Sequence, residues 1–341
     1  MKVFVTGVAG QLGHDVMNEL AKRGHEGVGT DLAPGYAGIQ DGTPVTGMPY
    51  VSLDITDREA VEKTIAEIKP DAVVHCAAWT AVDAAEDDDK RDKVKAINVD
   101  GTQNIADACK KVDAKMLYIS TDYVFDGQGT TPWDPECKDY KPLNNYGQTK
   151  LGGELAVSGT LDKYFIVRIA WVFGLNGKNF IKTMLNVGKN HPEVRVVCDQ
   201  IGTPTYTYDP ARLLVDMIET EKYGYYHATN SELPMTGAKD RAAGASNAAA
   251  GTDDGHGADR DADGTRCGFI SWYDFTCEIY RQAGLDTKIT PVTTAEYGLS
   301  KAARPFNSRL DKSKLEKAGF KPLPDWKDAL TRYLDALKTL N

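Results

Sequence analysis

Short apolar segments alternate with helical patterns through the first half of the chain. The apolar segments are residues 2–6, 26–31, 50–53, 72–75, 115–120 and 164–170. Between them, apolar positions recur every three or four residues, as in Leu12, Val16 and Leu20 and again in 59–68 and 97–110. Strands that alternate with helices of this length are typical of right-handed βαβ units. The pattern therefore predicts an α/β fold with a Rossmann-type, doubly wound parallel sheet.

The alternation loosens in the second half of the chain. Residues 180–188 and 210–219 have helical periodicity, and 326–340 places an apolar stripe on one helical face. We predict a dinucleotide-binding Rossmann domain at 1–170. A smaller α/β domain at 171–341 would be mainly substrate-binding and partly interleaved with the first.

One segment of the second half lacks any folding pattern. Residues 236–268 contain no Val, Ile, Leu, Met or aromatic residue, and 22 of these 33 residues are Ala, Gly or Asp. Such a segment cannot bury enough apolar surface to offset the entropy lost on ordering. We therefore predict that 236–268 is a disordered Ala/Gly/Asp-rich insert.

Composition and charge argue against several classes of protein. A formal net charge of −9 is unlike a nucleic-acid-binding or membrane-surface protein, because both need a basic face. No apolar run approaches the roughly 18 residues of a membrane span, and the first apolar run is too short for a signal peptide. The six cysteines are scattered and form no Cys-x-x-Cys pair. Together these features predict a cytoplasmic protein with reduced thiols.

A glycine motif follows the first predicted strand. Gly7, Gly10 and Gly13 form G-x-x-G-x-x-G between that strand and the first helix. The first glycine permits a tight turn, the second lets the backbone approach a pyrophosphate, and the third lets the helix pack on the strand. Asp31 ends the second strand, where a carboxylate would bind the ribose 2′-OH of NAD and repel a 2′-phosphate. The site favours NADH and leaves NADPH open, because basic residues end the first helix.

Two side chains at helical spacing are candidates for an acid–base step. Tyr146 and Lys150 stand at i and i+4, on one face of a predicted helix. An ammonium close to a phenol lowers the phenol's pKa from about 10, which makes the phenol a usable proton donor near neutral pH. Thr121 follows the fifth strand, at the edge where open α/β sheets bind ligands, and could hydrogen-bond a substrate carbonyl. Asp54 and Ile55 follow the third strand, where an adenine ring would lie.

Longer motifs resemble those of the extended short-chain dehydrogenase/reductases. Besides the glycine motif, these are AAWTAVD at 77–83, NVDGT at 98–102, STDYVFDG at 120–127, NYGQTK at 145–150, WVF at 171–173 and RPFNS at 304–308. They occur in the family's order from residue 1 to about 340, interrupted by the predicted insert. Within the family they resemble members that act in dTDP-rhamnose biosynthesis.

The resemblance implies a reaction, in which NADH or NADPH reduces dTDP-4-dehydro-β-L-rhamnose to dTDP-β-L-rhamnose. Tyr146 would protonate the developing alkoxide, Lys150 would hold the nicotinamide ribose and tune Tyr146, and Thr121 would tune the same network. The further cofactor contacts it implies are Gly10, Gln11 and Leu12 at the pyrophosphate, Asp54 and Ile55 at the adenosine half, and Ala77, Ala78, Trp79 and Thr80 at the centre. The substrate contacts it implies are Thr121, Asp122, Trp171 and, at the nucleotide phosphate, Arg304.

The resemblance also bears on partners and alternatives. Part of the family forms homodimers, sometimes with Mg²⁺, but the sequence shows no carboxylate cluster that we would assign to a metal. Another nucleotide-sugar 4-ketoreductase or epimerase of the superfamily would use the same Thr/Tyr/Lys set. A third hypothesis is a non-catalytic subunit similar to the regulatory β subunit of methionine adenosyltransferase. The intact Thr121, Tyr146 and Lys150 favour an enzyme that acts on a nucleotide sugar.

Overall fold

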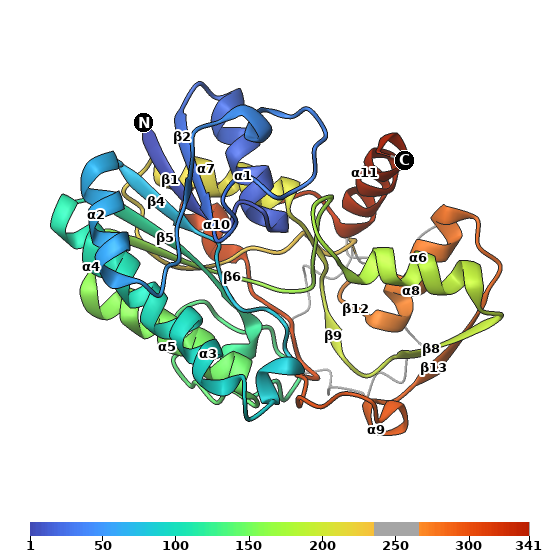
Figure 1. Ribbon diagram of the computed structural model, residues 1–341. Coiled ribbons are helices and arrows are strands. Elements are labelled where there is room, and N and C mark those ends of the chain that lie inside the picture. Colours follow the sequence, from blue (N-terminus) through green and yellow to red (C-terminus); the bar gives the residue numbers. More distant parts are fainter. Residues whose placement is uncertain (235–265, 341) are drawn as a thin grey trace.

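The large lobe is built on one parallel sheet. The structure is a computed structural model that describes residues 1–234 and 266–340 (Figure 1). The strand order is β11-β6-β5-β4-β1-β2-β3, and each neighbouring pair is parallel. The strands are β1 (Lys2–Thr6), β2 (Glu26–Asp31), β3 (Tyr50–Ser52), β4 (Ala72–His75), β5 (Lys115–Thr121), β6 (Tyr164–Ile169) and β11 (Gly224–His227). This sheet confirms the predicted Rossmann-type α/β fold.

Helices cover both faces of the sheet, which explains why its central strands are apolar almost throughout. Val3 and Val5 of β1 pack in one apolar cluster with one group of helices, whereas Phe4 packs in a second cluster on the opposite face. The first group is α1 (Gln11–Lys22), α7 (Tyr208–Ile218) and α10 (Ser313–Lys317). The second group is α2 (Arg58–Ile68), α4 (Thr102–Val112) and α5 (Asn145–Thr160).

A smaller lobe has its own core beside the sheet (Figure 1). Its helices are α6 (Phe180–Asn190), α8 (Trp272–Ala283), α9 (Thr294–Tyr297) and α11 (Trp326–Thr339). Its strand pairs are β8 (Glu193–Val197) with β13 (Lys288–Val292), β7 (Val172–Phe173) with β10 (Thr205–Tyr206), and β9 (Ile201–Gly202) with β12 (Ile270–Ser271). The smaller lobe lies beside the large one (Figure 1). Its core takes residues from 173–206, 270–280 and 326–334, whereas 211–228 and 315–323 pack in the large lobe, so the chain passes between the lobes several times.

Several elements of the smaller lobe, among them α8, β8 and β13, were not predicted, and two further differences lie in the large lobe. The edge strand β11 was not predicted, although its residues pair with β6 throughout their length. The single helix predicted at 97–110 is instead α3 (Arg91–Lys95), a π-helical turn (Ala96–Gly101) and then α4. Such π turns interrupt α-helices mostly at functional sites, and this one carries a side chain of the candidate site described below.

The predicted boundary of the insert is wrong at its C-terminal end. Arg266 is 6% exposed and pairs with the carboxylate of Asp274, with 3.3 Å between nitrogen and oxygen. The amide of Gly268 donates to the carbonyl of Leu233 at 2.9 Å, which closes a short β-bridge. The last three residues, 266–268, therefore belong to the fold, whereas the rest of the predicted insert lies outside the described residues. Within the described part of the chain, no helix is long and apolar enough to cross a bilayer.

Candidate active site

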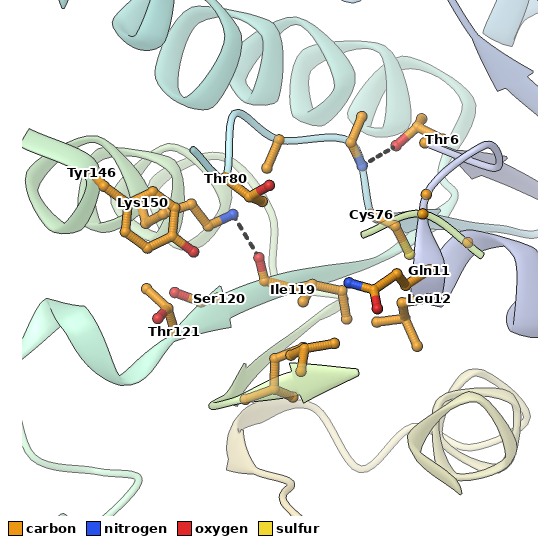
Figure 2. A pocket seen from close by; sticks show the side chains of 18 of the residues that line it. Thr6, Gln11, Leu12, Cys76, Thr80, Ile119, Ser120, Thr121, Tyr146 and Lys150 are labelled. Atoms are coloured by element: carbon orange, nitrogen blue, oxygen red, sulfur yellow. Dashed lines mark hydrogen bonds between the residues drawn. The ribbon is translucent and has the colours of Figure 1, made fainter. Parts of the chain in front are cut away.

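A cavity of about 700 Å³ opens where the strands of the large sheet end (Figure 2). The predicted residues that line it are Gly7, Gly10, Gln11, Leu12, Gly13, Asp31, Ile55, Ala77, Ala78, Thr80, Thr121, Asp122, Tyr146, Lys150 and Trp171. Asp54, Trp79 and Arg304 lie outside this lining. The parallel topology explains the gathering, because it brings the carboxyl ends of β1, β2, β4, β5 and β6 to one edge.

The glycine turn leaves no room for side chains. Gly7 has φ 72°, and a Cβ there would lie 2.7 Å from the amide nitrogen of Ala77. A Cβ on Gly13 would lie 2.3 Å from the carbonyl oxygen of Gly7. Gly10 begins α1 without a side-chain cap, so the first amides of the helix keep free donors. A bare turn that leads into an uncapped helix fits a pyrophosphate.

The adenosine end of the cavity is formed by β2 and by the loop after β3. The carboxylate of Asp31 accepts hydrogen bonds from the amides of Ala9 at 3.0 Å and Leu32 at 2.9 Å, which fix it beside the glycine turn. Ile55 lines the cavity next to it. The carboxylate of Asp54 instead accepts from the amide and hydroxyl of Thr56, so it shapes the loop from outside the cavity.

The π-helical turn supports the middle of the site. The side chain of Asn98 accepts from the amide of Trp79 at 2.8 Å and donates to the Thr149 hydroxyl on α5 at 3.1 Å. These two hydrogen bonds fix the position of Trp79, whose neighbours Ala78 and Thr80 line the cavity. The Trp79 indole donates to the carbonyl of Ala81 and does not face the cavity.

Lys150 lies on α5, which enters the site after an N-cap by Asn144. Its ammonium donates to the carbonyl of Ile119 at 2.7 Å (Figure 2). It also lies 4.1 Å from the centre of the Tyr118 ring. Burial lowers the pKa of Lys150 to about 7, and the nearby Glu154 carboxylate opposes that shift. The ammonium is thus held over β5 by a carbonyl and an aromatic face.

The expectation that Lys150 lowers the pKa of Tyr146 is wrong for this structure. Burial raises the pKa of the Tyr146 phenol above its usual value, while the interaction with the Thr121 hydroxyl lowers it. Desolvation of the phenol is the main cause of this rise in pKa, and the neighbouring Asp122 and Tyr123 act in the same direction. Figure 2 shows the phenol oxygen on the side of Ser120 and Thr121. The phenol is therefore protonated and aimed into the cavity, as a proton donor must be.

Asp122 is buried at the floor of the cavity. Its carboxylate accepts from the Ser308 hydroxyl at 2.5 Å and from the Thr121 hydroxyl at 3.0 Å. Burial raises the pKa of Asp122 to about 6, although both hydroxyls act in the opposite direction. Ser308 belongs to the RPFNS run, so this bond joins two motifs that are 186 residues apart in the sequence.

A second cavity of about 360 Å³ lies beside the first and shares Tyr123 and Trp171 with it. Trp171 has a left-handed backbone (φ 52°), and its ring stacks on Trp272 with 3.8 Å between centroids. Arg304 lines this second cavity, where it donates to the Asp83 carboxylate at 2.6 Å and the Tyr123 hydroxyl at 3.1 Å. The predicted substrate residues thus lie along a path from the first cavity into the second.

Several residues of the site were not predicted. Cys76 and Lys178 line the first cavity and Trp272 lines the second. Cys76 directly precedes a recognised motif, and this position could have indicated it. No sequence pattern connects Trp272 or Lys178 with the glycine turn. Among the residues that the structure describes, no group of three His, Cys, Asp or Glu could hold a metal ion.

Comparison with known proteins gives a family and related structures. The chain matches the family of the RmlD substrate binding domain over residues 1–250 and 263–339. It is 34% identical to a spore coat polysaccharide biosynthesis protein of Bacillus subtilis, over 98% of this chain and 96% of that protein. A crystal structure of a dTDP-4-dehydrorhamnose reductase from Clostridium acetobutylicum is 38% identical, with a TM-score of 0.79 and coverage of 99% of this chain and 100% of that chain. A dTDP-4-dehydrorhamnose reductase from Bacillus anthracis in complex with NADP is 34% identical, with a TM-score of 0.78 over 98% and 99% of the two chains.

Proposed function

The chain belongs to the family of the RmlD substrate binding domain, and from this membership we propose that it is a dTDP-4-dehydrorhamnose reductase. It would use NADH or NADPH to reduce dTDP-4-dehydro-β-L-rhamnose to dTDP-β-L-rhamnose. One observation carries the proposal: Thr121, Tyr146 and Lys150 line the same cavity as the glycine turn. That cavity continues into a second one large enough to hold part of a nucleotide sugar.

Each residue has a task that its surroundings allow. A nicotinamide dinucleotide held along the glycine turn would supply the hydride that C4 of the keto sugar receives. Tyr146 donates its phenolic proton to the oxygen that becomes negative, and burial keeps that proton on the phenol until it is needed. Lys150 contributes a positive charge beside the phenol and the nicotinamide ribose, where a low dielectric strengthens its effect. Thr121 orients the phenol through its hydroxyl.

The substrate would lie between the lobes. We assign the sugar to the space next to Asp122 and the Trp171 ring, because both line the first cavity beyond Tyr146. The nucleotide would extend into the second cavity, where the Arg304 guanidinium can pair with a phosphate. The Asp31 carboxylate at the adenosine end favours NADH over NADPH.

The reaction is tested by following NADH absorbance with purified protein and dTDP-4-dehydro-β-L-rhamnose. We expect NADH to be oxidised in step with sugar reduction. A 4-epimerase acts on a sugar with a hydroxyl at C4 and consumes no net NADH, so interconversion of 4-hydroxy nucleotide sugars without oxidation of NADH would contradict a reductase. Folded protein that binds NADH but turns over no sugar would point to a non-catalytic subunit.

Tyr146→Phe tests the proton donor. We expect kcat to fall by about 10²–10⁴-fold, because only the proton transfer is removed, while the Kd for NADH stays within a factor of two or so. Tyr226→Phe is the matched control, since that hydroxyl donates to the Lys222 carbonyl, away from the cavity. Normal turnover by Tyr146→Phe would refute the mechanism.

A further inference from the structure

A loop of the smaller lobe reaches the glycine turn of the large one. Residues 174–179 connect β7 to α6, and within them Gly177 and Lys178 line the same cavity as Gly10 and Gln11. A Cβ on Gly177 would lie 3.6 Å from the Gln11 side chain, so the loop passes close over the start of α1. The cavity therefore has a wall at its pyrophosphate end that comes from the other half of the chain.

Asn176 fixes this loop to the turn. Its amide donates to the carbonyls of Ala9 at 2.8 Å and Gly10 at 3.2 Å, and accepts from the amides of Ile39 at 3.0 Å and Gly177 at 3.1 Å. These four bonds use both donors and both acceptor positions of one side chain that is 5% exposed. A buried amide with all its bonds satisfied holds three loops in one arrangement.

Two further side chains fix the loop's own backbone. The Lys182 ammonium donates to the carbonyls of Leu175 at 2.6 Å and Gly177 at 2.8 Å. The Asn179 amide donates to the carbonyl of Gly174 at 2.8 Å and to the Gln11 side chain at 3.2 Å. The position of Lys178 is thus set by groups that are themselves bonded.

Lys178 places an unpaired positive charge at the pyrophosphate end of the cavity. Of the described residues that line the cavity, only Lys150 and Lys178 carry a positive charge, and Lys150 is bonded to the Ile119 carbonyl at the other end. In the described part of the chain, Lys178 makes no side-chain hydrogen bond or ion pair. An exposed ammonium without a partner is available for a ligand anion.

We propose that Lys178 binds the pyrophosphate of the dinucleotide cofactor, and that Asn176 is the positioning residue that holds its loop on the glycine turn. This rests on the proposed function, since it needs a nicotinamide dinucleotide in the cavity. The pyrophosphate is favoured over a 2′-phosphate because Gly177, next to Lys178, lies against Gln11 in the first turn of α1, and this helix has no side-chain cap on its first amides. An ammonium and a phosphate attract each other strongly at a partly desolvated site.

The test measures the Kd for NAD⁺ and for NADP⁺ by titration calorimetry. Lys178→Ala should raise both values by about tenfold, the effect expected from losing one charge-assisted contact. Lys178→Arg should recover most of the affinity. Lys189→Ala, an exposed lysine near the end of α6, is the matched control and should bind like wild type.

The remaining outcomes distinguish a failure of the proposal for Lys178 from a failure of the proposed function. Unchanged Kd values for Lys178→Ala would overturn the inference, and so would a loss confined to NADP⁺, because that would assign Lys178 to the 2′-phosphate. Failure of the wild-type protein to bind either dinucleotide would instead overturn the proposed function. Asn176→Asp, which replaces the donor with a carboxylate facing two carbonyls, should raise KM for NADH and leave kcat nearly unchanged. A decrease in kcat without any change in the KM for NADH, in a variant whose folding is verified by circular dichroism, would contradict this role of Asn176.

Discussion

At the residue scale, the surroundings of Lys150 make its charge sensitive to pH. Tyr118 lies under the ammonium, and Glu154 raises the pKa of Lys150, whereas burial lowers it to about 7. Cys76 also faces the group and remains a neutral thiol, because burial raises the pKa of Cys76 to about 12. His75 is neutral as well, since burial lowers its pKa to about 3. The Tyr118 face and the Glu154 charge therefore support the protonated form of Lys150.

Removing that aromatic face should change the pH profile. Because the charged form of Lys150 is the active one, kcat/KM for NADH should fall as pH rises through the pKa of Lys150. Tyr118→Leu should shift this fall to lower pH by roughly half a unit to one unit, the size of one desolvated cation–π contact. Tyr118→Phe keeps the ring and should keep the wild-type profile. Identical profiles for the two variants, both folded, would show that the ring does not support the charge.

The candidate active site shows which features of single residues could be predicted from the sequence. Helical spacing predicted that Tyr146 and Lys150 share a cavity, because i and i+4 lie on one face. It did not predict the bond from Lys150 to the carbonyl of Ile119, since backbone groups of another strand leave no trace in a side-chain pattern. The direction of the Tyr146 pKa shift was missed because the sequence does not show how deeply the phenol is buried.

At the scale of elements, strands were predictable where buried Val and Ile residues alternate with helical patterns. β4 is buried throughout and β6 at every position except Tyr164, and Val and Ile residues are frequent in both. β11 is as short as β4, but its sequence GYYH contains no Val or Ile, and only pairing with β6 identifies it. The π-helical turn is flanked by right-handed helical backbone at Lys95 and Thr102, so the chain does not leave the helical path there, and a single helix was predicted.

The contact between α1 and α7 contains a carboxylate whose ionisation should oppose folding. Asp15 of α1 is buried and accepts from the Thr207 hydroxyl at 2.5 Å, and burial raises its pKa to about 7. The folded state thus binds this proton more tightly than the unfolded state. The stabilising contribution is complete below about pH 4 and is lost as pH rises through about 7.

Asp15→Asn should remove this pH dependence. The amide stays neutral and can still accept from Thr207, so above pH 7 the variant should be more stable than wild type by about 1–2 kcal/mol. The measurement is Tm from pH 5 to pH 8.5, and the gap between the proteins should widen as pH rises. A gap that is constant, or that narrows with rising pH, would mean that Asp15 is ionised in the folded protein.

At the scale of the whole molecule, the site depends on both halves of the chain. The motifs of the first half predicted the cofactor cavity, because parallel topology collects consecutive strand ends at one edge. The residues from the second half, such as Lys178, Trp272 and Ser308, reach the site through tertiary packing that no local period describes. Arg304 was identified only through a family resemblance, and its bond to Asp83 spans 221 residues.

The corrected boundary of the insert gives a prediction about the whole fold. Two deletions should differ sharply: one removes 236–265, and the other continues through Gly268, each closed by a short glycine–serine linker. The longer one removes Arg266, which leaves the buried Asp274 without its counter-ion and breaks the bridge to Leu233. Losing one partner of a buried pair costs about 3 kcal/mol, so the longer deletion should lower Tm by several degrees relative to the shorter one.

The shorter deletion should retain wild-type activity, because its sequence contains almost no side chains that could pack in a core. Equal Tm values for the two deletions would show that Arg266 and Gly268 add nothing to the stability of the fold.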